Sequence, residues 1–363
     1  MADLRVLVVQ NQLCSRAWRH AKVLSDAGVE VSLFETGEPS EGYDYSFFDS
    51  RHTAGVGRDL RSVVLGRKKV IAGMKAAADA TDADVIHSNN GPDHMGAWAA
   101  RHLDVPLLHD VHDLWSATPV TYVRPFFRPA VKRMVAVWEK RAVEGADLVL
   151  TVSDGMKEYL ERRHQVGRSR VVGNKSLPQK IDPKPKLSAR DGKVHVVYAG
   201  GINTIPGSSR DFLPGLERLT SERVMCHIYP ITFTPEDDAE IRRRCDANPY
   251  LVRHDPVPYE DVIPELTQYD HGYLFYDTRD ENILIASPTK LFQYILAGLP
   301  VIVQSEGSIG AYVREKRCGI VADSLEEAAA SLEKESEWDL PASDCVLDAK
   351  EFLGFYDEVL SGR

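Results

Sequence analysis

The sequence contains no apolar run near the ~20 residues that a membrane-spanning helix needs. Its five cysteines form no C-x-x-C pair, which disfavours both a disulfide framework and a zinc knuckle. No repeat of solenoid length and no low-complexity tract is present. The first residues, MADLRVLVVQN, lack a basic segment followed by a cleavage site. Together these absences predict a globular protein of the reducing cytosol.

The charge balance is acidic and uneven. The formal net charge is −10, which argues against a general nucleic-acid binder, because such proteins are usually basic. Residues 1–178 hold 24 Lys and Arg against 22 Asp and Glu, so the remaining residues carry the negative charge. This asymmetry has two interpretations: either the first half meets an anionic surface, or its charges only face solvent.

Short β-branched runs alternate with helix-period segments, which predicts βαβ units and parallel sheets. The strands expected in the first half are 4–9, 29–34, 84–88, 105–111 and 146–152. The strands expected in the second half are 193–200, 224–231, 271–277, 299–304 and 318–323. The expected class is therefore α/β, with two doubly wound halves and a ligand at the carboxyl ends of their strands.

A length of 363 residues fits two domains better than one core. We expect one domain over 1–178 and a second domain over 193–343. The stretch 179–192 is rich in proline and lysine, which predicts a linker. We expect the last helix, about 344–360, to cross back onto the first domain.

The segment SPTKLFQYILAGLPVIV, residues 287–303, carries the clearest signal for a ligand site. Ser287 suits an N-cap, Pro288 suits the first helical position, and Gly298 suits the C-terminal stop. A helix that opens after a sheet edge offers free N–H groups to a diphosphate. Lys290 gains nothing from the helix dipole there, so it indicates either an anion or an ordinary surface lysine.

A second candidate phosphate site is YAGGIN, residues 198–203, directly after a predicted strand. Gly200 and Gly201 would let the backbone approach a ligand closely. Arg210, at the start of the next helix, could clamp a phosphate. A Gly-Gly pair alone is weak evidence, since many tight turns need one.

The segment LLHDVHDLW, residues 107–115, gathers histidine and carboxylate at the end of a predicted strand. Such groups can do acid–base work or bind metal, although H-x-x-H is not the helical zincin spacing. His109 alternates with Leu107 and fits a structural histidine. His112 falls in the loop and has the better claim to function. His87 also ends a strand and could merely support it.

The segment 122–141 interleaves cations with aromatic residues at helical spacing. Arg124, Arg128, Lys132 and Arg133 would form a basic face beside Phe126, Phe127 and Trp138. Such a face suits either an anionic membrane surface or an ordinary solvated surface over a core. The corresponding location is cytoplasmic, with peripheral contact at the inner face of the membrane.

Four segments, in order, resemble the retaining glycosyltransferases of the large family 4, which have the GT-B fold of two Rossmann-like domains. They are DVIHSNNGPDHMGAWAARHLDVPLLHDVHDLW (84–115), EKRAVEGADLVLTVSDGMKEYL (139–160), VVYAGGI (196–202) and PTKLFQYILAGLPVIV (288–303). The resemblance implies a hexosyltransferase that moves a sugar from a UDP- or GDP-sugar onto a glycan or lipid-linked acceptor.

The resemblance also implies roles for particular residues. By position, His112 corresponds to the histidine that contacts the donor sugar, and we group Asp113 with it as catalytic. Arg210 and Lys290 would offset the charge of the leaving diphosphate beside Gly200 and Gly201. The same donor site would include Ser287, Thr289 and Gln293. Neither a cofactor nor a metal is implied, because the cations and the helix N-terminus would do the metal's work.

The sequence departs from the family where many relatives carry a Glu-x7-Glu pair. Ile285 and Gln293 stand at those positions, and Gln293 can still hydrogen-bond a ribose without charge assistance. This departure supports an alternative, a non-catalytic GT-B protein that binds a glycan or a partner glycosyltransferase. A second alternative is a nucleotide-sugar epimerase, whose proton transfers would need acids such as Asp110 and Asp113.

Overall fold

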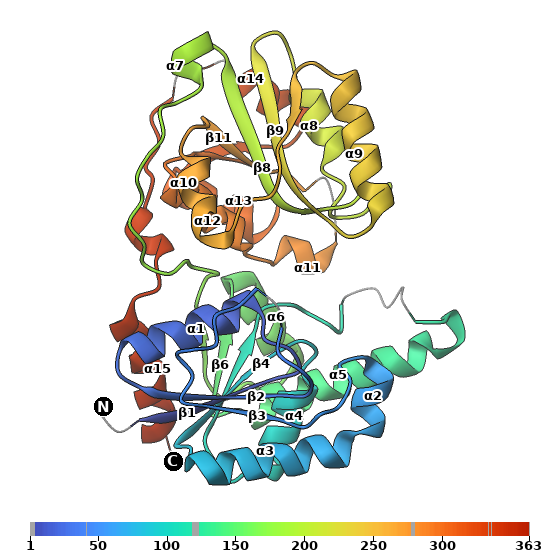
Figure 1. Cartoon of the computed structure of the whole chain (residues 1–363), viewed down its shortest axis with the longest axis vertical. Helices are drawn as coiled ribbons and strands as arrows, with labels where there is room; N and C mark the ends of the chain where they lie inside the picture. Colours follow the sequence, from blue (N-terminus) through green and yellow to red (C-terminus); the bar gives the residue numbers. More distant parts are fainter. Residues whose placement is uncertain are drawn as a thin grey trace. The chain divides into compact units, whose positions relative to one another are not determined.

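The chain folds into two compact α/β units. A computed structural model describes residues 4–40, 42–117, 123–276, 280–332, 334 and 336–362. The first unit comprises residues 1–172 together with 347–363, and the second comprises 173–346. Figure 1 shows the helices and strands of each unit.

The first unit contains a parallel sheet of seven strands. In spatial order these are β3 (Ser50–Thr53), β2 (Glu30–Glu35), β1 (Arg5–Gln10), β4 (Val85–Asn89), β5 (Leu107–Val111), β6 (Leu148–Thr151) and β7 (Ser169–Val171). The central strands β4 and β5 are buried at every position, as expected for apolar strands covered on both faces.

Helices cover both faces of this sheet (Figure 1). They are α1 (Ser15–Asp26), α2 (Leu60–Leu65), α3 (Arg67–Thr81), α4 (His94–His102), α5 (Arg128–Gly145), α6 (Asp154–Arg163) and α15 (Ala349–Ser361). Helices α3, α4 and α5 pack on the face that bears Ile86. The next residue, His87, points to the opposite face, where its Nδ1 lies 2.6 Å from the hydroxyl of Tyr356 on α15. The last helix therefore belongs to the first unit.

The second unit contains a parallel sheet of six strands. In spatial order these are β10 (Leu251–Arg253), β9 (Val224–Thr232), β8 (Val194–Ile202), β11 (His271–Leu274), β12 (Val301–Gln304) and β13 (Gly319–Ala322). Both sheets are parallel with helical crossovers, which confirms the predicted α/β class with two Rossmann-like units.

Helices of the second unit pack on the two faces of its sheet. They are α7 (Ser188–Asp191), α8 (Leu213–Leu219), α9 (Pro235–Ala247), α10 (Val262–Leu266), α11 (Glu281–Leu284), α12 (Thr289–Leu296), α13 (Gly307–Lys316) and α14 (Leu325–Leu332). Helices α8, α9 and α14 share one apolar core, and α10, α12 and α13 share the other.

The segment expected as a linker, 179–192, is part of the second unit. The backbone N–H of Lys184 donates to Oγ1 of Thr267 at 2.9 Å, and that of Leu187 donates to the carbonyl of Gln268 at 2.9 Å. These two hydrogen bonds hold the expected linker segment against the residues that directly follow α10.

Candidate active site

Two glycines at the end of β8 bring two cations against the backbone of the second unit. Gly200 has φ +136°, and a Cβ built on it would lie 2.6 Å from Nζ of Lys290. A Cβ on Gly201 would lie 2.5 Å from Nη1 of Arg210. The absence of side chains at both positions therefore leaves room for the two cations beside the strand end.

Lys290 is the second residue of α12, and its ammonium group lies 5.4 Å from the ring centroid of Tyr198. Burial, with a smaller effect from Arg210, lowers the pKa of Lys290 to about 8. No carboxylate pairs with it among the described residues. A desolvated cation without a counter-ion favours binding of an anion.

Arg210 is exposed and is presented by a loop that folds back on itself. Its carbonyl accepts a hydrogen bond from the backbone of Asn203 at 3.1 Å, and its own N–H donates to Oγ of Ser208 at 3.3 Å. Its guanidinium lies over the ring of Phe233, 5.3 Å from the centroid. Arg210 has no acidic partner in the part of the chain that the structure describes, so both cations remain available to a ligand.

The start of α12 differs from the prediction by one residue. Pro288 is the N-cap, with ψ 146°, and no side chain caps the helix. The predicted capping role of Ser287 is therefore wrong, because Pro288 is itself extended and the helix begins one residue later than expected. The carbonyl of Ser287 instead accepts from Nδ2 of Asn174 at 2.8 Å. Thr289 becomes the first helical residue, and Gln293 lies one turn further, 8 % exposed.

In the first unit, His112 lies directly after β5, where the sequence predicted it. Its backbone N–H donates to Oδ1 of Asn90 at 3.0 Å, and Asn90 in turn donates to the carbonyl of Asp113. Nε2 of His112 lies 3.9 Å from Oδ2 of Asp113, which is half-exposed. Asn90 thus fixes the turn that carries both predicted catalytic residues.

Cys14, which the sequence analysis did not select, is the main electrostatic partner of His112. Burial alone would lower the pKa of His112, but the charge and hydrogen bond of Cys14, helped by Asp113 and Asp110, raise the pKa to about 9. Burial likewise raises the pKa of Cys14, but His112 outweighs it and lowers the pKa to about 7. Cys14 is the N-cap residue of α1, and Nε2 of Gln10 donates to its sulfur at 3.9 Å.

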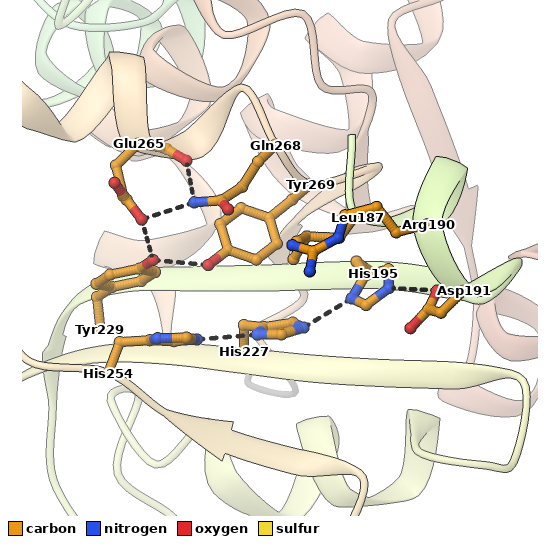
Figure 2. A pocket seen from close by; sticks show the side chains of 10 residues that line it. All are labelled: Leu187, Arg190, Asp191, His195, His227, Tyr229, His254, Glu265, Gln268 and Tyr269. Carbon is orange, nitrogen blue, oxygen red and sulfur yellow. Dashed lines mark hydrogen bonds and ion pairs between the residues drawn. The ribbon is translucent and has the colours of Figure 1, made fainter. Parts of the chain in front are cut away.

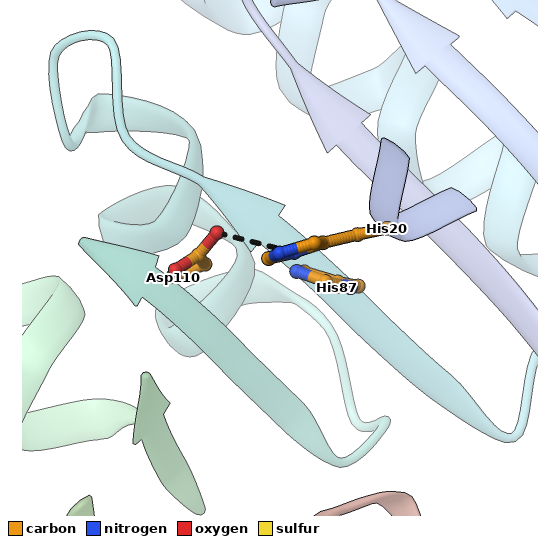
Figure 3. A group of neighbouring side chains, drawn as sticks. All are labelled: His20, His87 and Asp110. Carbon is orange, nitrogen blue, oxygen red and sulfur yellow. Dashed lines mark ion pairs between the residues drawn. The ribbon is translucent and has the colours of Figure 1, made fainter. Parts of the chain in front are cut away.

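Beneath this turn, Asp110, His20 and His87 bring ligand-type atoms within 4.8 Å of one another (Figure 3). Arg16 donates to both carboxylate oxygens of Asp110, at 2.7 and 2.8 Å. Burial and the Arg16 charge hold the pKa of His20 well below its usual range, and burial lowers that of His87 to about 4. The carboxylate charge is thus already neutralised by Arg16, which favours a buried ion pair over a cation site.

His109 has a structural environment, as its alternation with Leu107 indicated. It is fully buried, its Nδ1 lies 2.8 Å from Oγ of Ser88, and its Nε2 lies 3.2 Å from Oδ1 of Asp93. These contacts join β4, β5 and the start of α4. His109 is therefore explained without a ligand.

The basic face of α5, which comprises the start of this helix and the short turn before it (residues 124–133), lies on the surface of the first unit. Arg124, Lys132 and Arg133 are exposed, as are Phe126 and Phe127, at 87 % and 54 %. Arg128 differs, since its Nε donates to the carbonyl of Val123 at 2.9 Å. A pocket of about 430 Å³ adjoins the face. Its lining combines Arg67, Arg133 and Arg141 with Val64, Trp98, Ala130, Met134, Val137 and Trp138.

Known proteins resemble each unit separately. Residues 15–174 match the sequence model of Glycosyltransferase Family 4, and residues 244–343 match that of the Glucosyltransferase 3-like C-terminal domain. No curated protein matches the whole sequence significantly. Within the described residues, no helix is both long and apolar enough to cross a membrane.

Solved structures share the fold at low sequence identity. Sucrose-phosphate synthase from Thermosynechococcus elongatus has a TM-score of 0.69 at 14 % identity, over 99 % of this chain and 97 % of that one. The apo form of the lipopolysaccharide outer core galactosyltransferase WaaB has a TM-score of 0.67 at 13 % identity, over 99 % and 100 %. UDP-GlcNAc 2-epimerase from Methanocaldococcus jannaschii has a TM-score of 0.55 at 8 % identity, over 98 % and 99 %. The two family matches, one in each unit, together with the GT-B fold, identify the chain as a glycosyltransferase.

Proposed function

We propose that the chain transfers a hexose from a UDP- or GDP-sugar to a glycan or lipid-linked acceptor, with retention of configuration. The observation that carries the proposal is the pair of unpaired cations, Lys290 and Arg210, on the glycine turn of β8. The N-terminus of α12 adds backbone N–H groups and a positive dipole end at the same place. Together these groups suit the diphosphate of a nucleotide sugar.

In the proposed reaction the bond between the anomeric carbon and the phosphate oxygen breaks, and the nucleotide diphosphate leaves with the electron pair. An acceptor hydroxyl forms the new bond on the same face of the sugar and passes its proton to the departing phosphate. Lys290 and Arg210 would stabilise the charge that develops on the diphosphate. We therefore propose that no metal is required, since these cations occupy the position where a metal would act.

His112 is the residue that we propose to hydrogen-bond the transferred sugar. Its raised pKa keeps the imidazole protonated at neutral pH, so both ring nitrogens carry hydrogen and can donate. Asp113, 3.9 Å away, would orient the ring. The epimerase alternative gains nothing from Asp110, because Arg16 binds both of its oxygens.

We further propose that the basic face of α5 meets an anionic membrane at the cytoplasmic surface. Arg124, Lys132 and Arg133 are exposed beside two exposed phenylalanines, and no acid occurs between residues 123 and 138. Cations flanking exposed aromatic rings are typical of interfacial helices. Such a surface would bring the enzyme to a lipid-linked acceptor.

Calorimetric titration with UDP, GDP, ADP and CMP, without added metal, tests the donor site. We expect micromolar binding of UDP or GDP, and at least tenfold weaker binding for Lys290→Ala. Lys350→Ala removes an exposed cation in the first unit and serves as the charge-matched control. If none of the four nucleotides binds, or if Lys290→Ala binds as the native chain does, the proposed donor site is wrong.

A further inference from the structure

The second unit contains a pocket of about 490 Å³ that is distinct from the glycine turn (Figure 2). Its lining residues come from α7, β8, β9, the end of β10 and α10: Leu187, Arg190, Asp191, His195, His227, Tyr229, His254, Glu265, Gln268 and Tyr269. His195 lies near the start of β8 and Gly200 lies five residues further along it, so the two positions are roughly 16 Å apart along the strand. The pocket is therefore not part of the proposed donor site.

Both acids of this pocket already have partners, whereas its arginine has no acidic one. Glu265 forms an ion pair with Lys184 and accepts a hydrogen bond from the hydroxyl of Tyr229 at 2.7 Å. Asp191 lies 3.1 Å from Nε2 of His195 and accepts from the backbone of Lys193 at 3.0 Å. Arg190 is exposed and has no acidic partner among the described residues. Its guanidinium is therefore available to an anionic ligand.

Three histidines form a hydrogen-bonded row along the floor of the pocket (Figure 2). Nδ1 of His195 lies 2.8 Å from Nε2 of His227, and Nδ1 of His227 lies 2.9 Å from Nε2 of His254. The pKa of Asp191 is lowered, first by the backbone of Lys193 and then by His195, so this carboxylate only accepts. His195 must then donate from Nε2, His227 from its Nε2 to His195, and His254 from its Nε2 to His227.

This direction leaves Nδ1 of His254 as the free acceptor at the end of the row. An added proton can bind at this nitrogen without breaking any hydrogen bond between the three imidazoles. The Asp191 carboxylate accepts from the opposite end of the row. Burial lowers the pKa of His254 and lowers that of His227 to about 3, so these two imidazoles are neutral at pH 7 when the pocket holds no anion. The ionisable groups that face the row are Asp191, Glu265, Asp255, Arg190, Tyr229 and Tyr269. The row therefore gains a proton only if a nearby anion offsets its desolvation.

We propose that this pocket binds a small phosphate monoester, with Arg190 holding the phosphate and the histidine row taking up one proton on binding. The volume exceeds that of a bare phosphate, and Gln268 with the tyrosine hydroxyls offers polar contacts to a hydroxylated body such as a sugar. The three imidazoles are hydrogen-bonded to one another, so their ring nitrogens do not converge on one point as metal ligands would. This arrangement suits an anion site that takes up a proton better than a metal site.

Calorimetry on the full chain carrying Lys290→Ala, which removes the donor-site lysine, tests the proposal. Sulfate is the first probe because its charge does not change between pH 6 and 8, so any proton uptake comes from the protein. Titrations in two buffers of different protonation enthalpy count that proton. We expect sulfate affinity to rise up to about tenfold for each unit that the pH falls.

Three variants and one comparison decide the outcome. Arg190→Ala should weaken sulfate binding at least tenfold, and His254→Gln should bind sulfate without proton uptake. Lys350→Ala should change neither the sulfate affinity nor the proton uptake.

Glucose 6-phosphate should bind more tightly than inorganic phosphate, and equal affinities would overturn the monoester assignment. Absence of binding at tens of millimolar sulfate, or binding unchanged by Arg190→Ala, would overturn the site itself. Because Lys290 is replaced throughout, these outcomes do not depend on the proposed donor site.

Discussion

Lys290 occupies the space that a side chain at position 200 would fill. A Cβ on Gly200 would lie 2.6 Å from Nζ of Lys290, and the φ of Gly200, +136°, disfavours any other residue. The glycine on β8 and the lysine on α12 are 90 positions apart in the sequence. The ammonium group can therefore reach the strand end only because residue 200 has no side chain.

Gly200→Ala should displace Lys290 and weaken the binding of UDP or GDP at least tenfold. The matched control is Gly28→Ala in the first unit, which also replaces a glycine of positive φ, +84°, but has no atom within 4 Å of its added Cβ. The control should lose about 1 kcal/mol of stability from the backbone conformation and keep its nucleotide affinity. Titration calorimetry and thermal unfolding of both variants measure the two effects. Equal losses of affinity would contradict a specific role for Gly200.

Nucleotide binding should weaken as the pH rises through about 8. Burial lowers the pKa of Lys290 to about 8, so the free protein loses this positive charge above that pH, whereas an ordinary lysine keeps it to about 10. A bound diphosphate favours the charged amine, so binding should take up a proton above pH 8. Lys290→Arg keeps its positive charge over this whole pH range, so the variant should bind the nucleotide with an affinity that does not fall above pH 8. An identical pH profile for the native chain and Lys290→Arg would contradict the assignment.

Cys14 should be the most reactive of the five thiols toward iodoacetamide. Its pKa is lowered to about 7 by His112, whereas burial raises the pKa of Cys245, which is also partly exposed, to about 11. The alkylation rate should therefore rise with pH and level off above 7, because the thiolate is the nucleophile. His112→Gln should slow the reaction at pH 7 about tenfold or more. Mass spectrometry of each cysteine measures the rates, and equal rates at Cys14 and Cys245 would exclude the thiolate–imidazolium pair.

The architecture was predictable because it depends on local patterns. The runs that became β1 and β8 are mostly apolar, and a buried parallel strand produces this pattern. The edge strands β3, β7 and β10 were missed, since they are only three or four residues long and two of them, β3 and β7, are largely polar.

The candidate site was only partly predictable from the sequence. Gly200 and Gly201 lie in the YAGGIN segment, and Lys290 lies in the 287–303 segment. Each segment is a local strand–turn–helix pattern that can be recognised from the sequence alone. Cys14 is 98 positions from His112, and only the packing of α1 against β5 brings the two together. The rings beneath the two cations belong to Tyr198, in the middle of β8, and to Phe233, directly after β9, and neither was selected as a partner of a cation from the sequence. Such pairs depend on tertiary contacts that a single sequence does not encode locally.

Tyr356→Phe should destabilise the first unit by about 1–3 kcal/mol, because it removes the partner of a buried histidine nitrogen. The Tyr356 hydroxyl lies 2.6 Å from Nδ1 of His87, and both residues are fully buried. The exposed substitution Asp357→Asn, one residue away on α15, should have no measurable effect. Hydrogen exchange of the β4 amides reports the first unit separately from the second. Equal protection in the two variants would show that α15 does not depend on this contact.

Binding to anionic vesicles should be lost when Arg124, Lys132 and Arg133 are replaced together by glutamate. Each basic residue near an anionic surface contributes about 1 kcal/mol, so three charge reversals should weaken binding at least a hundredfold. Arg128 is left unchanged because its side chain holds the carbonyl of Val123.

The matched control replaces the exposed cations Lys180, Lys334 and Lys350 by glutamate, which gives the same change in net charge outside this face. Sedimentation with phosphatidylserine-containing vesicles should recover the native chain and the control but not the α5 variant. Phe126→Ala should weaken vesicle binding less than the charge reversals do. It should also weaken the vesicle binding that remains at high salt, because an apolar ring enters the interface independently of ionic strength. If the native chain binds neutral and anionic vesicles equally, the cations of this face do not attract it to the membrane. If it binds neither, the face is a solvated surface over the core of the first unit, and the acceptor need not be membrane-bound.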